Sequence, residues 1–291
     1  MTLIQLKEHI YSELSILYPS TEIQSLLTII LKEYLGLQRI DIVTRPKLVI
    51  PSEKIRTITD VIHRLKTHEP IQYIIGNTEF FGYPFDVNQH VLIPRPETEE
   101  LVDWVIRSAR EIEGKGITNP LSILDIGTGS GCISISLKKN LVSANVSAID
   151  ISKKAIDTAQ ENAKRNKVAV EFITQDILAT TSLPKTYDII ISNPPYVREL
   201  EKELMHENVL NFEPQKALFV EDKDPLVFYR KIAQLSKLHL NHNGLLFFEI
   251  NEFLGNEMIQ LLDSYGFSNI QLKKDMFNKN RMISAKKLYH G

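Results

Sequence analysis

Hydrophobic residues recur with a helical period over the first 75 positions of the chain. Residues 23–34 place them three or four positions apart, and residues 3–17 and 55–65 repeat this pattern. Thr21 stands where it could cap the middle helix, and Gly36 stands where it could end that helix. The pattern predicts a small N-terminal helical bundle.

Residues 76–97 have a different composition, with aromatic and β-branched side chains around Gly82-Tyr83-Pro84. This composition predicts a two-stranded hairpin that links two domains. Pro94-Arg95-Pro96 ends the segment, and a helical period resumes from Glu97.

Short apolar strands alternate with amphipathic segments from residue 98 to residue 291. Such alternation predicts an α/β domain with a mostly parallel, Rossmann-like sheet of seven strands and helices on both faces. The last two strands have no helix between them and are expected to form an antiparallel hairpin. The predicted strands are Ser122–Ile126, Val146–Ile149, Val170–Ile173, Tyr187–Ser192, Leu245–Ile250, Ile270–Lys273 and Met282–Ala285.

A glycine-rich turn follows the first strand of this domain and leads into a helix that begins near Cys132. Glycines in such a turn let the backbone approach a bound ligand closely. The turn alone is weak evidence, because dinucleotide enzymes share it and a tight strand-to-helix turn needs glycine in any case. Its residues are Gly127, Thr128, Gly129, Ser130 and Gly131.

Acidic residues follow the next two strands. Asp150 ends the second strand, about 20 residues beyond the glycine-rich turn, where a carboxylate can accept both hydroxyls of a ribose. Asp176 and Ile177 follow the third strand, where a carboxylate and a backbone N–H could read the edge of an adenine. These strand ends meet at the carboxyl edge of the sheet, where open α/β sheets bind ligands. Hydride transfer from a dinucleotide remains compatible with this spacing.

The fourth strand ends in Asn193-Pro194-Pro195-Tyr196. Two prolines can merely terminate a strand, but a carboxamide before them and an aromatic ring after them suit the alkylation of a planar nitrogen. The Asn193 side-chain oxygen and the Pro194 carbonyl can each accept one N–H of a substrate NH₂, which turns the nitrogen lone pair toward a methyl donor. The prolines restrict φ and so hold that carbonyl in place, and Tyr196 can lie against the flat substrate group. An activated methyl donor needs no strong general base.

Composition and charge narrow the range of partners. The formal net charge is −2, and residues 1–90 hold nine Lys and Arg against ten Asp and Glu, so a polyanion-coating protein is not expected. The single cysteine, Cys132, allows no intrachain disulfide, and no His/Cys cluster offers a metal site. Charged residues interrupt the first thirty positions, which predicts neither a signal peptide nor a membrane span. We therefore expect a cytoplasmic protein without a metal.

Several further segments, in order along nearly the whole chain, resemble the HemK/PrmC-type release factor glutamine methyltransferases. In the first 65 residues the resemblance lies only in the helical architecture and not in sequence motifs. The segments that carry the resemblance, beside the tetrapeptide, are Glu69–Gly76, Phe80-Phe81-Gly82, Ile93–Glu99 and Phe212-Glu213-Pro214. The chain departs from the usual family pattern at Asp222–Pro225, where members often have glycine, and at Asn278–Arg281, which replaces a glycine-aspartate-arginine ending.

This resemblance implies a methyl transfer from S-adenosylmethionine, with S-adenosylhomocysteine as the product. Gly127 to Gly131, Asp150, Asp176-Ile177 and Asn193 would hold S-adenosylmethionine, and Asn193 to Tyr196 would hold the glutamine in the GGQ loop of a release factor. The helical domain would dock against the body of that release factor. We expect a monomer that binds neither nucleic acid nor membrane.

Two other functions fit parts of the pattern. A nucleic-acid adenine or guanine methyltransferase could use the same tetrapeptide, but it would need a basic face for the phosphates. A non-catalytic adaptor could keep the cofactor fold, although it would have no use for the complete tetrapeptide. The roles of Arg95, Glu97, Glu213 and Glu249 stay open between surface or structural residues and a part in the site.

Overall fold

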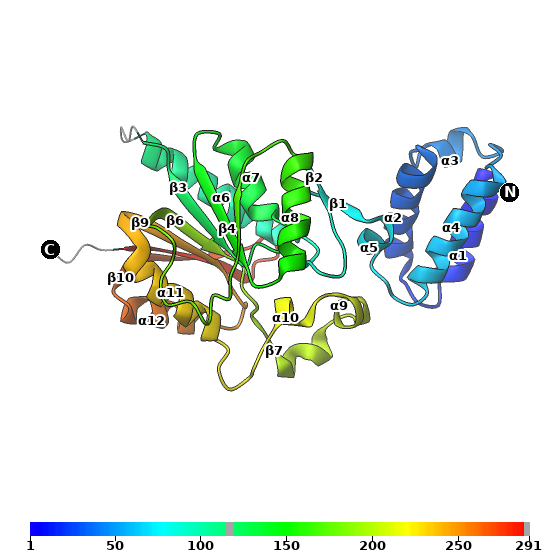
Figure 1. Cartoon of the computed structure of the whole chain (residues 1–291). Helices are drawn as coiled ribbons and strands as arrows, with labels where there is room; N and C mark the ends of the chain where they lie inside the picture. Colours follow the sequence, from blue (N-terminus) through cyan, green and yellow to red (C-terminus); the bar gives the residue numbers. More distant parts are fainter. Residues whose placement is uncertain (115–118, 288–291) are drawn as a thin grey trace. The chain divides into compact units, whose positions relative to one another are not determined.

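The computed structural model of the chain describes residues 1–114 and 119–287. These residues form two compact units, which are coloured along the sequence in Figure 1. The first unit comprises Met1–Gly76 and His206–Phe212, and the second comprises Asn77–Met205 and Glu213–Gly291. Within the described residues, no helix is long and apolar enough to cross a membrane.

The regular elements described in the first unit are all helices, as the hydrophobic period predicted. Gly36 ends the second helical segment with φ of 64°, as expected, but the cap predicted at Thr21 is wrong, because α2 begins at Ser20 after Pro19 and has no side-chain cap. Leu17 lies beyond the end of α1 and is exposed. The helices are α1 Leu3–Leu14, α2 Ser20–Ile30, a π-helical turn Leu31–Leu35, α3 Asp41–Thr44, α4 Ser52–Leu65, α5 Ile71–Ile75 and α9 Glu207–Phe212.

The second unit is built on the predicted seven-stranded sheet, with strand order β10-β11-β9-β6-β3-β4-β5. Strands β9, β6, β3, β4 and β5 are parallel to one another, and β10 and β11 form the antiparallel hairpin at the C-terminal end of the chain. The fold class expected from the sequence is therefore confirmed. The strands are β3 Ser122–Ile126, β4 Asn145–Asp150, β5 Glu171–Thr174, β6 Tyr187–Ser192, β9 Leu240–Glu249, β10 Phe267–Lys274 and β11 Asn280–Lys287.

Alternate residues of the central strands enter two hydrophobic cores, one on each face of the sheet. On β3, Ile123 belongs to the core under α6, α7 and α8, whereas Leu124 belongs to the core under α11 and α12. Because side chains alternate along a strand, a continuous apolar run is what a sheet covered on both faces requires. The covering helices are α6 Pro96–Glu113, α7 Cys132–Asn140, α8 Lys153–Arg165, α11 Val227–His239 and α12 Gly255–Ser264.

The predicted hairpin consists of β1 Asn77–Phe80 and β2 Tyr83–Asp86. Its aromatic residues Phe80 and Phe85 are buried in the first of these two cores, and Asn162 of α8 exchanges hydrogen bonds with the backbone of Asp86. The hairpin is thus packed into the second unit. The same unit contains four elements that the sequence did not predict: β7 Val197–Arg198, the 3₁₀ helix Glu199–Leu204, α10 Gln215–Leu218 and β8 Phe219–Val220.

Candidate active site

A cavity of about 640 Å³ opens at the carboxyl ends of β3, β4, β5 and β6. Its size falls within the range of small-molecule sites, and its place is where parallel α/β sheets bind ligands. Most of the residues that the sequence singled out line this cavity: Gly127, Thr128, Gly129, Ser130, Asp150, Asp176, Ile177, Asn193, Pro194 and Pro195. Gly131 and Tyr196 are not among the lining residues.

The glycine-rich turn has a left-handed backbone at three positions. Gly127, Gly129 and Gly131 have φ values of 78°, 54° and 81°, which favour glycine. A Cβ on Gly131 would lie 2.9 Å from Ile135 Cδ1 and 3.1 Å from Ala159 Cβ, so this glycine lets the turn pack against its own helix and α8. A Cβ on Gly129 would meet nothing within 4 Å, which is the open approach that a ligand needs.

The buried carboxylate of Asp125 accepts hydrogen bonds from the glycine-rich turn and from the helix that follows it. Its Oδ2 accepts hydrogen bonds from the Thr128 hydroxyl at 2.6 Å and from the Ser134 backbone at 3.2 Å. Its Oδ1 is buried and has no hydrogen-bond partner among the described residues. Burial raises the pKa of Asp125 to about 7, and these hydrogen bonds oppose part of that rise.

Asp150 joins the end of β4 to the turn. Its Oδ2 accepts the Gly129 N–H at 2.9 Å, and its Oδ1 accepts the Ser152 N–H at 2.8 Å. Burial raises the pKa of Asp150, and the N–H donors from Ser152, Gly129 and Ile151 lower it again. Each carboxylate oxygen keeps a second lone pair, and the residue borders the cavity, so it can still accept hydroxyl groups of a ligand.

Asp176 and Ile177 follow β5 and line the cavity. Asp176 Oδ1 accepts the Leu178 N–H at 2.8 Å, which holds this carboxylate in place, and Ile177 is buried in the core under α11.

These observations fit S-adenosylmethionine. Its adenosine needs an apolar slot with hydroxyl acceptors, which Ile177 and Asp150 supply on the cavity wall. The turn presents an open glycine, Gly129, on the cavity wall, which lets a ligand approach the backbone closely. Residues Gly127 to Ser130, Asp150, Asp176 and Ile177 would hold it, and when bound it supplies a methyl group on a positively charged sulfur.

Asn193 follows β6 at the edge of the cavity and is oriented by α6. Its Nδ2 donates a hydrogen bond to Thr98 Oγ1 at 3.3 Å. No hydrogen bond among the described residues uses its Oδ1, which is therefore available to accept. The Gly127 backbone lies against Asn193, since a Cβ on that glycine would be 3.8 Å from the Asn193 carbonyl oxygen. Asn193 and the glycine-rich turn are thus adjacent.

Tyr196 is held by a carboxylate behind the cavity. Its hydroxyl donates to Glu249 Oε1 at 3.0 Å and lies 3.4 Å from Arg281 Nη1. Burial and the Glu249 charge raise the pKa of Tyr196, so the phenol stays protonated and acts as a donor. The contact of the ring with a flat substrate group stays a prediction, because the ring does not line the cavity.

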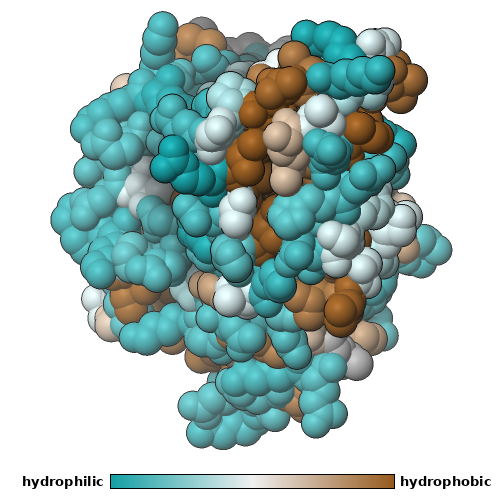
Figure 2. Space-filling model, turned by 90° about the vertical axis from the view of Figure 1, so that its right-hand side faces the viewer, coloured by the Kyte–Doolittle hydropathy of each residue, from teal (hydrophilic) through white to brown (hydrophobic). Residues whose placement is uncertain are grey.

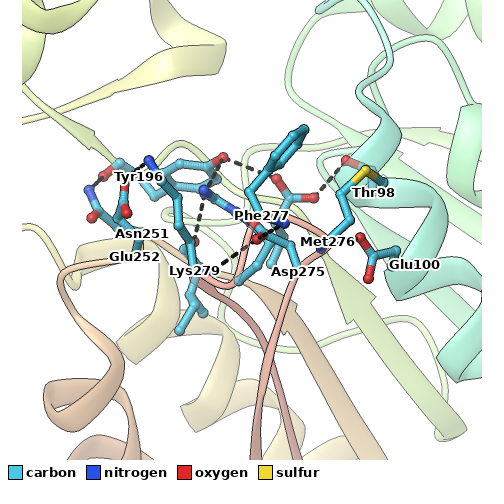
Figure 3. A network of polar contacts seen from close by, with 12 residues as sticks. Thr98, Glu100, Tyr196, Asn251, Glu252, Asp275, Met276, Phe277 and Lys279 are labelled. Carbon is cyan, nitrogen blue, oxygen red and sulfur yellow. Dashed lines mark hydrogen bonds and ion pairs between the residues drawn. The ribbon is translucent and has the colours of Figure 1, made fainter.

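Sequence reasoning missed Thr98 and Arg281 and left Glu249 open. Figure 3 shows Thr98 and Tyr196 in one polar network that extends to Asp275 and Lys279. Thr98 Oγ1 donates to Glu249 Oε2 at 2.6 Å, and Arg281 Nε donates to Asp275 Oδ2 at 3.0 Å. The early signals were Glu249 at the end of a strand, and the segments Ile93–Glu99 and Asn278–Arg281, which contain Thr98 and Arg281.

Arg95 and Glu213, two further residues with open roles, form an ion pair beside the cavity. Arg95 Nη2 lies 2.5 Å from Glu213 Oε1, and Glu213 Oε2 accepts the Ile93 N–H at 3.2 Å. Because Glu213 is 4% exposed, this pair fixes the segment before α6 that borders the cavity.

Comparisons with known proteins show the family of the chain. The chain matches the family models described as methyltransferase small domain, over residues 115–218, and PrmC N-terminal domain, over residues 18–76. It is 51% identical over 272 residues to the release factor glutamine methyltransferase of Flavobacterium psychrophilum. This match covers 94% of each of the two chains. A relative with the same name from Bacteroides thetaiotaomicron is 43% identical over 278 residues, 95% of this chain and 97% of the relative.

Among solved structures, the T. thermophilus 16S rRNA N2 G1207 methyltransferase, in complex with AdoMet and guanosine, aligns with a TM-score of 0.51. The two chains are 19% identical over 72% of this chain and 49% of the other, so this match shows the fold alone.

Proposed function

Because this chain belongs to the release factor glutamine methyltransferase family, we infer that it methylates the glutamine side chain in the GGQ motif of a peptide-chain release factor. The methyl donor is S-adenosylmethionine, the product is S-adenosylhomocysteine, and the modified protein acts in translation termination. The observation that carries the proposal is the adjacency of Asn193 and Pro194 to the glycine-rich turn around one cavity.

The proposed catalysis depends on orientation. An amide nitrogen is a poor nucleophile because its lone pair is delocalised. The Asn193 Oδ1 and the Pro194 carbonyl would each accept one N–H of the glutamine amide, which holds the lone pair toward the methyl group. A nitrogen–carbon bond forms as the sulfur–carbon bond breaks.

The proton that the nitrogen must lose does not require a strong base. Alkylation makes the nitrogen more acidic, so one proton can leave to solvent after the new bond has formed. Fixed acceptors, which need no rearrangement during the reaction, therefore carry the rate enhancement.

We also propose that the helical unit docks the release factor body. Figure 2 shows hydrophobic residues gathered among hydrophilic ones on the face that this view presents. In the helical unit, several exposed hydrophobic side chains lie in α3 and next to it in sequence: Ile40, Val43 and Val49 are 58%, 76% and 71% exposed. A second contact of this kind would raise the effective concentration of a small, flexible GGQ loop at the cavity.

We also propose that the protein acts in the cytoplasm and does not bind nucleic acid. These two proposals rest on the single cysteine and on the near balance of acidic and basic residues in the chain.

The direct test is mass spectrometry of a purified release factor incubated with this protein and S-adenosylmethionine. We expect one added methyl group on the glutamine of the GGQ motif, and none on duplex DNA or RNA in a competition assay. Preferential labelling of nucleic acid would favour a base methyltransferase instead.

A further inference from the structure

We propose that Glu249 is a positioning residue, which acts through the Thr98 hydroxyl to fix the carboxamide of Asn193 with its oxygen available to the substrate. The inference rests on the proposed function, since it assigns how the acceptor for the glutamine amide is oriented. It concerns residues from three separate elements: the end of β9, the first turn of α6 and the end of β6.

The starting point is that two hydroxyl groups approach one buried carboxylate. Glu249 is 2% exposed, and its two oxygens lie 2.6 Å from Thr98 Oγ1 and 3.0 Å from the Tyr196 hydroxyl. An ionised carboxylate can only accept hydrogen bonds, so both hydroxyls must donate to it. The distance to Thr98 is in the range of a charge-assisted bond.

The orientation of Asn193 follows from the single hydrogen of Thr98. Once that hydrogen is directed to Glu249, Thr98 Oγ1 can only accept, and the group that faces it at 3.3 Å must be the Asn193 NH₂. The opposite orientation would place the Asn193 Oδ1 against Thr98 Oγ1, and that hydroxyl has no second hydrogen to donate. The carboxamide is therefore held with its acceptor, Oδ1, free for the substrate.

The surroundings of Glu249 decide whether it keeps its charge. Burial raises the pKa of this carboxyl, and the Glu97 charge on α6 acts in the same direction. Thr98, Arg281 and Tyr196 oppose that rise by donating hydrogen bonds or positive charge.

Two further groups complete this environment. Tyr229 of α11 donates its hydroxyl to the Glu249 backbone carbonyl at 3.1 Å, and Asp275 holds Arg281 from the far side at 3.0 Å. The Arg281 cation and the Thr98 and Tyr196 hydroxyls thus oppose the effect of burial on the Glu249 carboxyl, and the orientation of Asn193 requires the ionised form of that carboxyl.

The substitution E249Q would change this hydrogen-bond pattern while it keeps the size and shape of the side chain. The new carboxamide offers one acceptor and one donor where two donors face it. Because Arg281 Nη1 already approaches the Tyr196 oxygen, the new NH₂ is best placed against Thr98. Thr98 would then accept from that NH₂ and donate to Asn193, which turns the Asn193 oxygen away from the substrate.

The test compares E249Q and T98V with T98S and with T158V, using intact release factor as the substrate. T98S keeps the hydroxyl. Thr158 is another buried threonine, 9% exposed, whose hydroxyl accepts from Asn88 at 3.0 Å outside this network. Rates are expressed per cofactor-binding site, counted by titration with S-adenosylmethionine, so that unfolded protein does not contribute.

We expect E249Q and T98V to lower kcat at least about tenfold, as for a misplaced reacting group, with little change in cofactor affinity. T98S should recover most of the loss seen in T98V, and T158V should keep the wild-type kcat. Wild-type kcat in both E249Q and T98V would overturn the positioning role. Absence of any transfer by the wild-type protein would instead refute the proposed function itself.

Discussion

The Gly129 N–H donates to Asp150 Oδ2 at 2.9 Å, so the carboxylate at the end of β4 is tied directly to the glycine-rich turn after β3. The turn and the carboxylate that is expected to bind the ribose are therefore one structural unit. A change at Asp150 should affect both the ligand hydroxyls and the order of the turn.

Replacing Asp150 with alanine should weaken the binding of S-adenosylmethionine by about 1.5–3 kcal/mol, the range for a hydrogen bond to a charged group. This corresponds to a Kd increase of about 10- to 150-fold, which calorimetric titration can measure. Asp157→Ala is the matched control, because Asp157 lies on the surface of α8 and pairs only with Lys153 at 2.6 Å among the described residues. Unchanged affinity in a folded Asp150→Ala protein would remove Asp150 from the binding site.

Asn193→Ala should lower kcat by about 10²–10³ and change cofactor affinity much less. The loss is that of a fixed transition-state partner. Asn193→Asp keeps the shape but places a charge against Thr98 and beside the methyl donor, so it should also change cofactor binding. Single-turnover rates with bound cofactor test this, and wild-type turnover in Asn193→Ala would rule out the orientation mechanism.

The sheet could be predicted because its strands are apolar runs between turn residues. Ser122–Ile126 and Tyr187–Ser192 agree with the structure at both ends. The strand that was predicted to begin at Leu245 begins at Leu240 in the structure. The prediction started too late because the composition of Asn241 to Gly244 is typical of a turn. Asn243 has φ of 61° within this stretch, and the pairing with β6 shifts register there, so the strand continues through an irregularity that a local pattern conceals.

The polar network behind the cavity could not be predicted, because it depends on contacts between distant residues. Thr98 and Glu249 are 151 positions apart, and neither has a neighbour in sequence that marks its role. Likewise, the short segment His206–Phe212 groups with the helical unit, and nothing in seven residues of mixed polarity indicates that. Asn278, the first residue of the segment that departs from the usual family ending, takes a φ of 62°, which asparagine tolerates better than other non-glycine residues.

Asp125 should make the free energy of unfolding depend on pH. Its pKa is about 7 in the folded protein because of burial, against about 3.9 in an unfolded chain. Between these values the folded state keeps a proton that the unfolded state releases, so stability is lost as pH rises from about 4 to about 7. Above that window both states are ionised and the loss stops growing.

The measurement is denaturant unfolding of the wild type and of Asp125→Asn at several pH values. The stability difference between them should change by up to about 1.4 kcal/mol per pH unit within the window, in favour of the asparagine variant as pH rises. Comparing the two proteins cancels the contribution of Glu249, whose pKa burial also raises. The charge of Asp150 contributes to the raised pKa of Asp125, so it is part of the measured difference. A difference that does not vary with pH would mean that Asp125 titrates normally.

The exposed hydrophobic residues around α3 should matter for an intact release factor and not for a short GGQ peptide. Val43 and Val49 are 76% and 71% exposed, so replacing both with aspartate removes little buried contact and should leave the unit folded. If this surface docks the release factor, kcat/KM for the intact protein should fall at least about tenfold, which corresponds to losing about 1.4 kcal/mol of binding. The same variant should keep the wild-type kcat/KM on the peptide, because the cavity residues are unchanged.

Val142→Asp is the matched control, since Val142 is 77% exposed but belongs to the second unit, where no docking is proposed. An equal loss on peptide and intact protein would point to a structural effect on the cavity, and no loss on either would place the docking surface elsewhere.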